Sequence, residues 1–565
     1  MFVKKQMKRF ASPTIFPLLT AFYFLLSVLP VYAAQTGIYN VTDFGAAADG
    51  KTLDTKAIQA AVDSCSQSGG GTVFLLAGTY LSGTIYLKDH VRLKLAQGSV
   101  LLGSTNVNDY PLNKCDFPSY SDAYVGRALI WGEGLHDIAI TGKGIIDGQG
   151  ASFRDNIPEQ AKWKKLVSFY QDTTRYRPKA GYINRPYIIR LINCRDVLVE
   201  DVTLRHSAMW MQQYLNCDFV RIRNITVYNH GSKNNDMIDI DCSRDVVISG
   251  CYGDSDDDGI TLKSTGGVPT ENVTISDCIV SSFCNAIKMG TESSGGFKNI
   301  TITNCVIRPS SEPNKIYGRA EGLAGLALEI VDGGWLDGIT ISNITIKGTT
   351  APIFMRLGNR ARRYKPDLPE PAVGKFRNVI ISNITAKDAG ATGCSITGLP
   401  DYPVENVTLA NINISFVGGG TKEQAEVQVP ENERNYPEST MFGILPAYGF
   451  FCRHVNGLTF RDIKLSTGEP DYRPSFICDD VSNLKLDGFA AQTEHDVAAQ
   501  VVFRNVRNAM ITGCAPTASA PFLSLENQCD RISVFANDFR RIPKPILFDK
   551  STPKSALYEK MNRKH

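Results

Sequence analysis

Apolar and polar residues alternate in a short phrase that recurs along most of the chain. In most copies the phrase begins with Asn, Asp or Gly, continues with alternating Val or Ile, and ends at Asn, Asp or Gly. Alternation with a period of two is typical of a strand. Aligning the first apolar residue of five copies gives steps of 23, 26, 27 and 27 residues, at Val197, Val220, Val246, Val273 and Ile300.

A strand that returns every 23 to 27 residues leaves too little chain for a strand–helix–strand unit. The cycle matches one coil of a parallel β-helix, in which stacked coils bury the Val and Ile side chains that a single coil cannot bury. The sequence therefore predicts an all-β protein. We expect a single-stranded right-handed parallel β-helix, a solenoid with a short N-terminal capping helix and inserted loops.

The residues after Asp54 follow a helical spacing instead. Ile58, Ala61, Val62 and Cys65 stand at positions i, i+3, i+4 and i+7, as apolar residues do on one face of an amphipathic helix. Because the terminal repeats of a solenoid need a cap, we expect this helix to cover its open end.

Asparagine and cysteine recur at fixed positions of the repeat. Asn-x-Thr triplets, such as the one at Asn299, resemble glycosylation sites. Their fixed place favours side chains stacked at coil corners, where Asn tolerates a left-handed backbone. The chain has 14 cysteines, an even number that would allow disulfides in an exported protein. Since many occupy one position of the repeat, we expect buried free thiols.

Four stretches rich in Arg, Lys, Tyr, Pro and Glu interrupt the rhythm, at residues 151–184, 308–325, 359–374 and 418–450. Insertions in a solenoid become loops, often on the binding face, so we expect them to wall a cleft. Residues 34–565 are predicted to form one elongated β-helix domain rather than several compact ones.

The first 33 residues have the pattern of a signal peptide. A mainly apolar run follows the basic residues Lys4, Lys5, Lys8 and Arg9, and Ala33 ends a stretch that a signal peptidase could read. Residues 1–33 therefore predict an exported protein, periplasmic or extracellular, with no membrane attachment after cleavage. An uncleaved membrane anchor is the alternative.

Removing residues 1–33 changes the formal charge from +3 to −1, because the segment carries four basic residues and no acidic ones. The mature protein then has no general attraction for polyanions, so nucleic acid is not an expected partner. An acidic substrate would have to be held by local basic groups.

Two acidic clusters stand out: one contains Asp236, and the other contains Asp257 and Asp258. Asp236 and Asp257 are 21 residues apart, close to one coil, which would place them on neighbouring coils about 4.8 Å apart. Crowded carboxylates raise the pKa of one member, as a general acid requires. Three readings stay open from the residues alone: catalysis, a calcium site, or aspartates that only shape turns.

The motifs around these clusters resemble the polygalacturonases of glycoside hydrolase family 28, a family with a pectin-lyase-like β-helix. The resemblance rests on Asn234-Asn235-Asp236-Met237 and on Asp257-Asp258-Gly259-Ile-Thr-Leu-Lys263-Ser264. It is clear over about residues 38–350; beyond them only the coil repeat supports it.

The resemblance implies an inverting glycoside hydrolase that cleaves α-galacturonosyl bonds in pectic polysaccharide or oligosaccharide. Asp257 would be the general acid that protonates the leaving oxygen. Asp236 and Asp258 would hold and deprotonate the attacking water. The resemblance implies neither a cofactor nor a catalytic metal, and we expect a monomer.

Two departures from the family pattern bear on the substrate. The usual Gly-His-Gly motif aligns with Cys284-Asn285-Ala286, so an asparagine replaces the histidine, and His230 is a candidate to compensate. The family's Arg-x-Lys pair, which grips a galacturonate carboxylate beyond the cleavage point, aligns with Ala327-Leu328-Glu329. A glutamate there would repel a carboxylate, which favours a neutral leaving sugar such as the rhamnose of rhamnogalacturonan.

The predicted substrate-binding residues combine these motif positions with basic groups nearby. Arginine can bind a carboxylate through two parallel hydrogen bonds, although the arginine run on the third insertion could equally be a solvated loop. The full set is Asn234, Lys263, Asn285, Lys288, Glu329, Arg356 and Arg360.

Two other functions fit the same fold. A polysaccharide lyase would need calcium-binding carboxylates and a basic residue as the proton acceptor. A non-catalytic carbohydrate-binding β-helix would explain the loss of two family motifs. Whether cleavage occurs within a chain or at its end is open at this point.

Overall fold

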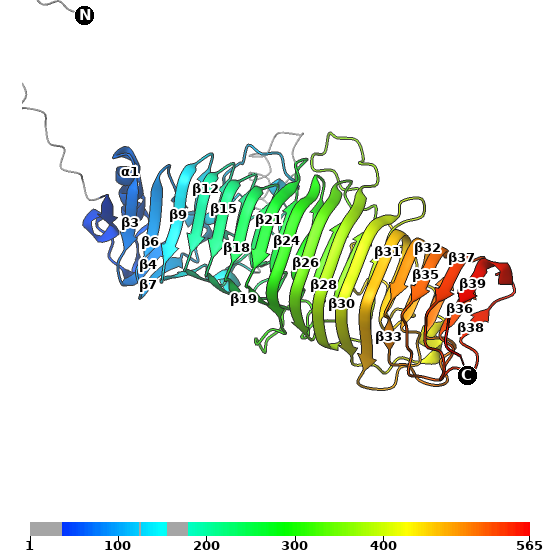
Figure 1. Ribbon diagram of the computed structural model, residues 1–565. Coiled ribbons are helices and arrows are strands. Elements are labelled where there is room, and N and C mark those ends of the chain that lie inside the picture. Colours follow the sequence, from blue (N-terminus) through cyan, green and yellow to red (C-terminus); the bar gives the residue numbers. More distant parts are fainter. Residues whose placement is uncertain (1–36, 124–125, 155–178, 565) are drawn as a thin grey trace, which may run out of the picture.

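The computed structural model describes residues 37–123, 126–154 and 179–564. The predicted signal peptide and most of the first predicted insertion lie outside the described residues. Parallel strands stack into one long right-handed β-helix (Figure 1), as predicted.

The strands pair in the register that the repeat predicts. Val197 lies beside Val220, Val220 beside Val246, and the series continues through Val273 to Ile300. These residues belong to one stack of strands, formed by β12 (Arg195–Glu200), β15 (Asp218–Arg223), β18 (Arg244–Ser249), β21 (Thr270–Ser276) and β24 (Gly296–Ile307).

Each central coil has two further strands. A second stack contains β13 (Thr203–Arg205), β16 (Thr226–Asn229), β19 (Tyr252–Ser255) and β22 (Ile279–Ser282). A third stack contains β14 (Gln212–Leu215), β17 (Ile238–Asp241), β20 (Ile260–Ser264), β23 (Asn285–Ser293), β25 (Ala324–Ile330), β27 (Ala351–Leu357) and β29 (Cys394–Thr397). All residues of these third-stack strands are buried, including those that face away from the core, so other parts of the chain cover this sheet.

The core consists of inward-facing aliphatic side chains that stack from coil to coil. Ile302 is fully buried and pairs with Ile275 and Ile341 on the neighbouring coils. Ile302→Ala should lower the free energy of unfolding by about 2–5 kcal/mol, since it leaves a cavity between stacked coils. Urea denaturation would measure the loss, and Thr301→Ala, at the exposed neighbouring position, is the matched control. Equal unfolding midpoints for the two variants would contradict this view of the core.

The coil corners carry the predicted asparagine ladder. Asn299 donates to Asn272 Oδ1 at 3.1 Å, and Asn272 donates to Asp245 Oδ1 at 3.0 Å. Both asparagines have positive φ, 53° and 55° respectively, the backbone conformation that asparagine tolerates. All 14 cysteines are buried free thiols, which confirms that prediction too.

The predicted capping helix is α1 (Thr55–Gln67), which buries Ile58, Ala61, Val62 and Cys65 against the first coils. The later insertions also occur. They separate β24 from β25, β27 from β28 (Lys375–Ala389), and β30 (Val404–Phe416) from β31 (Phe450–Thr467). Within the described part of the chain, no helix is both long enough and apolar enough to cross a membrane.

Candidate active site

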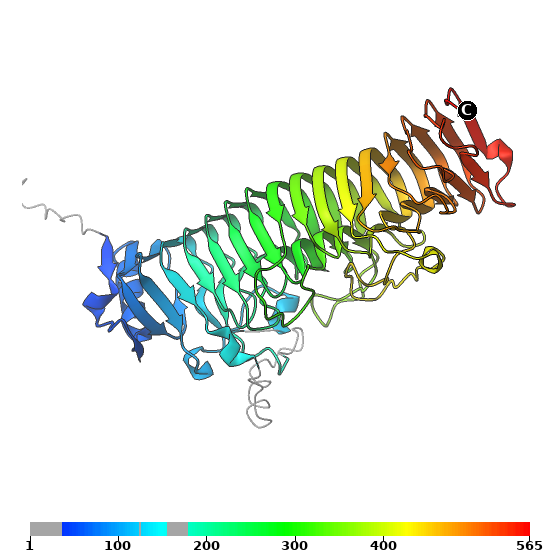
Figure 2. The ribbon, with the colours of Figure 1, turned by 90° about the horizontal axis from the view of Figure 1, so that it is seen from below.

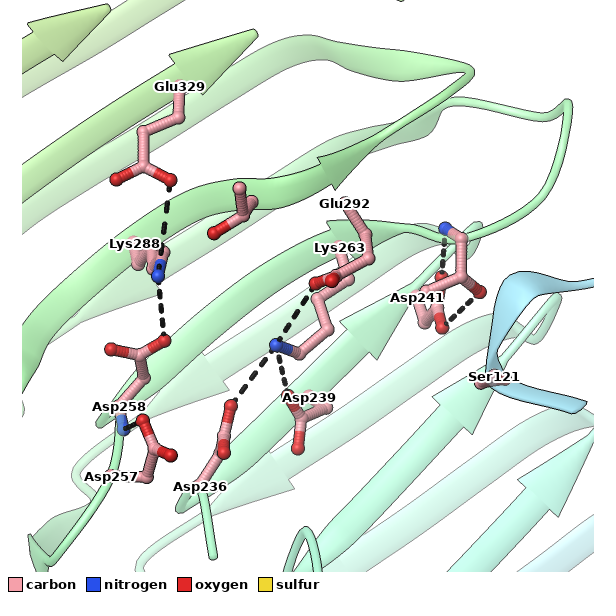
Figure 3. Close-up of polar contacts among 12 residues, drawn as sticks. Ser121, Asp236, Asp239, Asp241, Asp257, Asp258, Lys263, Lys288, Glu292 and Glu329 are labelled. Atoms are coloured by element: carbon pink, nitrogen blue, oxygen red, sulfur yellow. Dashed lines mark hydrogen bonds and ion pairs between the residues drawn. The ribbon is translucent and has the colours of Figure 1, made fainter. Parts of the chain in front are cut away.

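The three predicted catalytic aspartates lie at the turns that enter β17 and β20. Asp236 lies two residues before β17, and Asp257 and Asp258 lie between β19 and β20. The amide of Met237 donates to the carbonyl of Asp258 at 2.9 Å, so the two turns are joined directly. The three carboxylates therefore lie on adjacent coils (Figure 3), as the 21-residue spacing predicts.

Serine hydroxyls fix the backbone of the turn that carries the Asp257–Asp258 pair. Ser255 and Ser282 donate to the Asp257 carbonyl at 2.8 and 2.7 Å. The Asp258 amide donates to Asp257 Oδ1 at 2.9 Å. Asp257 is the most exposed of the three aspartates at 8%, against 1% for Asp236 and 4% for Asp258. Asp257 is therefore the aspartate of the three that lies nearest to solvent.

The Asp258 carboxylate accepts hydrogen bonds from Lys288 and Asn285. Lys288 Nζ donates to Oδ2 at 3.0 Å, and the amide and side chain of Asn285 donate to Oδ1 at 3.0 and 2.8 Å. Burial favours the neutral acid, but Lys288, Lys263 and Asn285 outweigh it and lower the pKa of Asp258. Asp258 is thus held as a carboxylate.

Asp257 has the opposite electrostatic environment. Burial and the nearby charges of Asp236 and Asp258 raise its pKa well above the usual value, and the lysines oppose this only partly. Two adjacent carboxyl groups with pKa values shifted in opposite directions form the acid–base arrangement of many hydrolases.

Asp236 is paired with Lys263, whose Nζ lies 3.1 Å from Asp236 Oδ2 and also reaches Asp239 and Glu292 at 3.4 and 3.6 Å. Burial raises the pKa of Asp236, while Lys263 lowers it in part. The ammonium of Lys263 lies 4.4 Å from the ring of Trp210. Lys263, predicted to bind substrate, is buried and contacts these acidic residues.

Lys288 also contacts acidic residues, from β25 and from the last insertion. Its Nζ lies 3.9 Å from Glu329 Oε2 and 3.9 Å from Glu438 Oε1. Burial raises the pKa of Glu329 to about 8 and that of Glu438 to about 7. Glu329 is fully buried, and both of its carboxyl oxygens lack a hydrogen-bond partner.

Glu438 and Tyr436 also contact this site, although no sequence motif predicts that they do. Asn285 donates to Glu438 Oε2 at 3.4 Å, and Thr291 donates to the Tyr436 hydroxyl at 2.9 Å. Both residues lie in an insertion, where the coil period gives no position. The only signal in the sequence was the charged and aromatic composition of that segment.

His230 does not replace the missing histidine at Asn285. Its two ring nitrogens lie 3.0 Å from Asp256 and 3.2 Å from Asp254, and these carboxylates raise the pKa of His230 to about 9 against the effect of burial. Asp256 also accepts from the Asn235 side chain at 3.2 Å. His230 therefore fastens the turn that leads to Asp236.

The remaining predicted binding residues, Asn234, Arg356 and Arg360, contact other parts of the protein. Asn234 accepts from Arg185 Nη1 at 3.4 Å, beside the first turn. Arg360 forms an ion pair with Asp332 and donates to the Thr291 carbonyl at 3.0 Å. Arg356 is buried and donates to the carbonyls of Gly398 and Glu431 at 3.1 and 2.6 Å, so its guanidinium binds a loop.

Asp257, Asp258 and Cys284 could together face one metal ion, since one ligand atom from each lies within 4.8 Å of the others. Burial raises the pKa of the Cys284 thiol well above its usual value, and Lys288 already contacts Asp258. A protonated thiol and a carboxylate paired with an ammonium do not suit calcium, which prefers six to eight oxygen ligands.

Comparison with known proteins identifies the family. Residues 103–435 match the model of glycosyl hydrolases family 28, and residues 38–115 match a model named rhamnogalacturonase A/epimerase, pectate lyase-like. A probable polygalacturonase of Vitis vinifera is 34% identical over 235 residues, which are 40% of this chain and 44% of that protein.

One further curated protein and one solved structure are similar to this chain. The exo-poly-alpha-D-galacturonosidase of Dickeya chrysanthemi is 27% identical over 264 residues, 42% of this chain and 43% of that protein. The aligned regions thus span less than half the length of either curated relative. The hyperthermoactive exopolygalacturonase of Thermotoga maritima shares the fold, with a TM-score of 0.59 at 22% identity, over 78% of this chain and 93% of that chain. Because the family model matches more than half of the residues, this chain belongs to family 28 of the glycosyl hydrolases.

Proposed function

We propose that this protein hydrolyses α-galacturonosyl bonds of pectic polysaccharide with inversion at the anomeric carbon. The observation that carries the proposal is the opposite shift in pKa of two adjacent carboxyls, raised for Asp257 and lowered for Asp258. Family membership and the relatives named as polygalacturonases support the reaction class.

In this mechanism Asp257, whose raised pKa favours the protonated form, gives its proton to the leaving glycosidic oxygen. Asp258, whose carboxylate is stabilised by Lys288 and Asn285, accepts a proton from the attacking water. Asp236 accepts the second hydrogen bond of the same water. One bond to the anomeric carbon breaks as the other forms, and inversion results because the water attacks opposite the leaving group. The chemistry requires no cofactor.

We propose rhamnogalacturonan as the preferred substrate. The position where the family resemblance expects a lysine holds Glu329, and the nearest cation, Lys288, is shared by Asp258, Glu329 and Glu438. Since burial raises the pKa of Glu329 to about 8, it is largely neutral at pH 6. Galacturonate is thus disfavoured in the leaving-group position because Lys288 already contacts three protein carboxyl groups and does not pair with the substrate.

The test uses purified protein and size-defined oligosaccharides of rhamnogalacturonan and homogalacturonan. We expect a higher kcat/KM on rhamnogalacturonan, with the β-anomer of galacturonate first in proton NMR spectra taken during the reaction. The α-anomer first would exclude inversion, and a higher kcat/KM on homogalacturonan would exclude the substrate preference.

Glu329→Lys should raise the homogalacturonan-to-rhamnogalacturonan ratio of kcat/KM by about tenfold. The new ammonium would pair with the carboxylate of a galacturonate leaving group, and a tenfold ratio corresponds to about 1.4 kcal/mol. Glu329→Gln is the matched control at pH 6. It removes a largely neutral carboxyl, so the ratio should change by less than about twofold. If Glu329→Lys folds, as judged by its melting temperature, and leaves the ratio unchanged, the assignment of this subsite fails.

The competing functions differ in their products. A lyase on this fold would release an unsaturated sugar that absorbs in the ultraviolet, whereas hydrolysis releases none. A non-catalytic binding protein would release no reducing ends. The signal-peptide pattern of residues 1–33 supports action outside the cytoplasm, which we propose for a monomeric enzyme.

A further inference from the structure

The last insertion has a structural role that its sequence did not reveal. Residues 417–449, which we call the cross-loop, connect β30 to β31 and contain the short helix α3 (Lys422–Ala425). The yellow segment beside the solenoid in Figure 2 belongs to this loop. Although it leaves the solenoid several coils away from the aspartates, its contacts return to the coil next to them.

The cross-loop is fastened at both edges of the third stack. At the edge where β25 begins, Ser439 Oγ donates to the Leu323 carbonyl at 2.9 Å. At the edge where β27 ends, the Asn359 amide donates to the Glu433 carbonyl at 2.7 Å. The segment from Glu433 to Ser439 therefore crosses the sheet from one edge to the other.

The loop also covers the outer face of the sheet. Ala327 and Phe354 continue the outward-facing row of Lys288, because Lys288 pairs with Ala327 and Ala327 with Phe354. Both are fully buried, in a cluster that includes Phe442 and Leu445 of the cross-loop. A sugar chain lying along this sheet could not pass over β25 and β27.

The barrier ends close to the reacting groups. Glu438 contacts Asn285 and Lys288 on β23, and β23 pairs directly with β20, the strand that Asp258 precedes. Adjacent coils are separated by about 4.8 Å, which is comparable to the length of one sugar unit. The barrier thus begins on the coil next to Asp258, about one sugar length along the sheet.

We propose that the cross-loop ends the substrate groove one sugar beyond the cleavage point, so that the protein acts at the end of a pectic chain and releases single sugars. This inference rests on the proposed hydrolysis.

Time courses on long homogalacturonan chains test it directly, because every backbone bond in them is an α-galacturonosyl bond. Reducing ends, viscosity and product size are measured together on the wild-type protein. We expect monosaccharide from the first time points and little loss of viscosity while the first tenth or so of the bonds breaks. An early fall in viscosity with oligosaccharide products would overturn the proposal. Absence of any new reducing end would instead refute hydrolysis itself, so the two failures are distinguishable.

A shortened variant tests whether the cross-loop is responsible. Replacing residues 434–440 by a short Gly-Ser linker removes Tyr436 and Glu438 but keeps Phe442 and Leu445 over the sheet. Mass spectrometry of its products should show disaccharides, because the groove then extends by one coil, as far as the Phe442 and Leu445 side chains that still cover β25 and β27. Lys422→Ala, in the exposed part of the same loop where Lys422 pairs with Asp496, should release monosaccharide only. A folded, shortened variant that still releases only monosaccharide would refute the role of the loop.

Discussion

Asp257→Asn should lower kcat by about 10²–10⁴-fold, the usual contribution of a general acid. Asparagine keeps the size and the acceptor oxygen that meets the Asp258 amide, but it has no proton to give to the leaving oxygen. Since the raised pKa of Asp257 favours its protonated, uncharged form, asparagine removes the acid without adding a charge. Substrate affinity should therefore remain similar.

Reducing-end release gives kcat, and calorimetric titration with an uncleaved oligosaccharide gives the affinity. Asp277→Asn is the control, because Asp277 is an exposed corner aspartate one coil further along. If Asp257→Asn kept full activity, the proton donor would have to be another group. If it lost affinity and kcat together, a role in binding would be the better explanation.

The coil architecture could be predicted from the sequence because a single repeated interaction determines it. Val246, Val273 and Ile300 bury the same face at the same position of successive coils, so their spacing gives the register directly. The same regularity brings Asp236 next to Asp258, since both precede third-stack strands that pair in register. The coil period and the alternation of polar and apolar residues were therefore sufficient to place the catalytic aspartates on adjacent coils.

The roles of the basic residues required the structure. Coil spacing places Lys263 and Lys288 near the acidic turns, but it does not state which carboxylate each one meets. Both lysines are buried and form ion pairs with protein carboxylates. The prediction that they bind the substrate would have required exposed side chains. His230 lies close to Asp236 in sequence, yet its ring is turned toward Asp254 and Asp256.

Glu438 could not be placed from the sequence for a different reason. It is 153 residues from Asn285 along the chain, and an insertion has no period that relates it to the coils. Its contact depends on the path of the whole cross-loop over the sheet. Insertions therefore determine how the site is enclosed, while the repeat determines how the aspartates are arranged.

Lys288→Met should shift the acid limb of the kcat/KM profile to higher pH by about one to three units, the usual effect of one close opposite charge. Asp258 must be ionised to accept a proton from water. Lys288 lowers the pKa of Asp258, so removing the ammonium raises that pKa and the carboxylate is lost at a higher pH. Lys288 also lowers the pKa of Asp257, so the alkaline limb should move upward as well.

Profiles of kcat/KM against pH for the wild type, Lys288→Met and Lys288→Arg separate charge from packing. Arginine keeps the positive charge beside Asp258, so its acid limb should stay closer to that of the wild type. A loss of activity at every pH with unshifted limbs would show that Lys288 only supports the fold. Because Asn285 donates two hydrogen bonds to Asp258 and carries no charge, the positive charge that favours ionisation of Asp258 comes from Lys288 and, to a smaller extent, from Lys263.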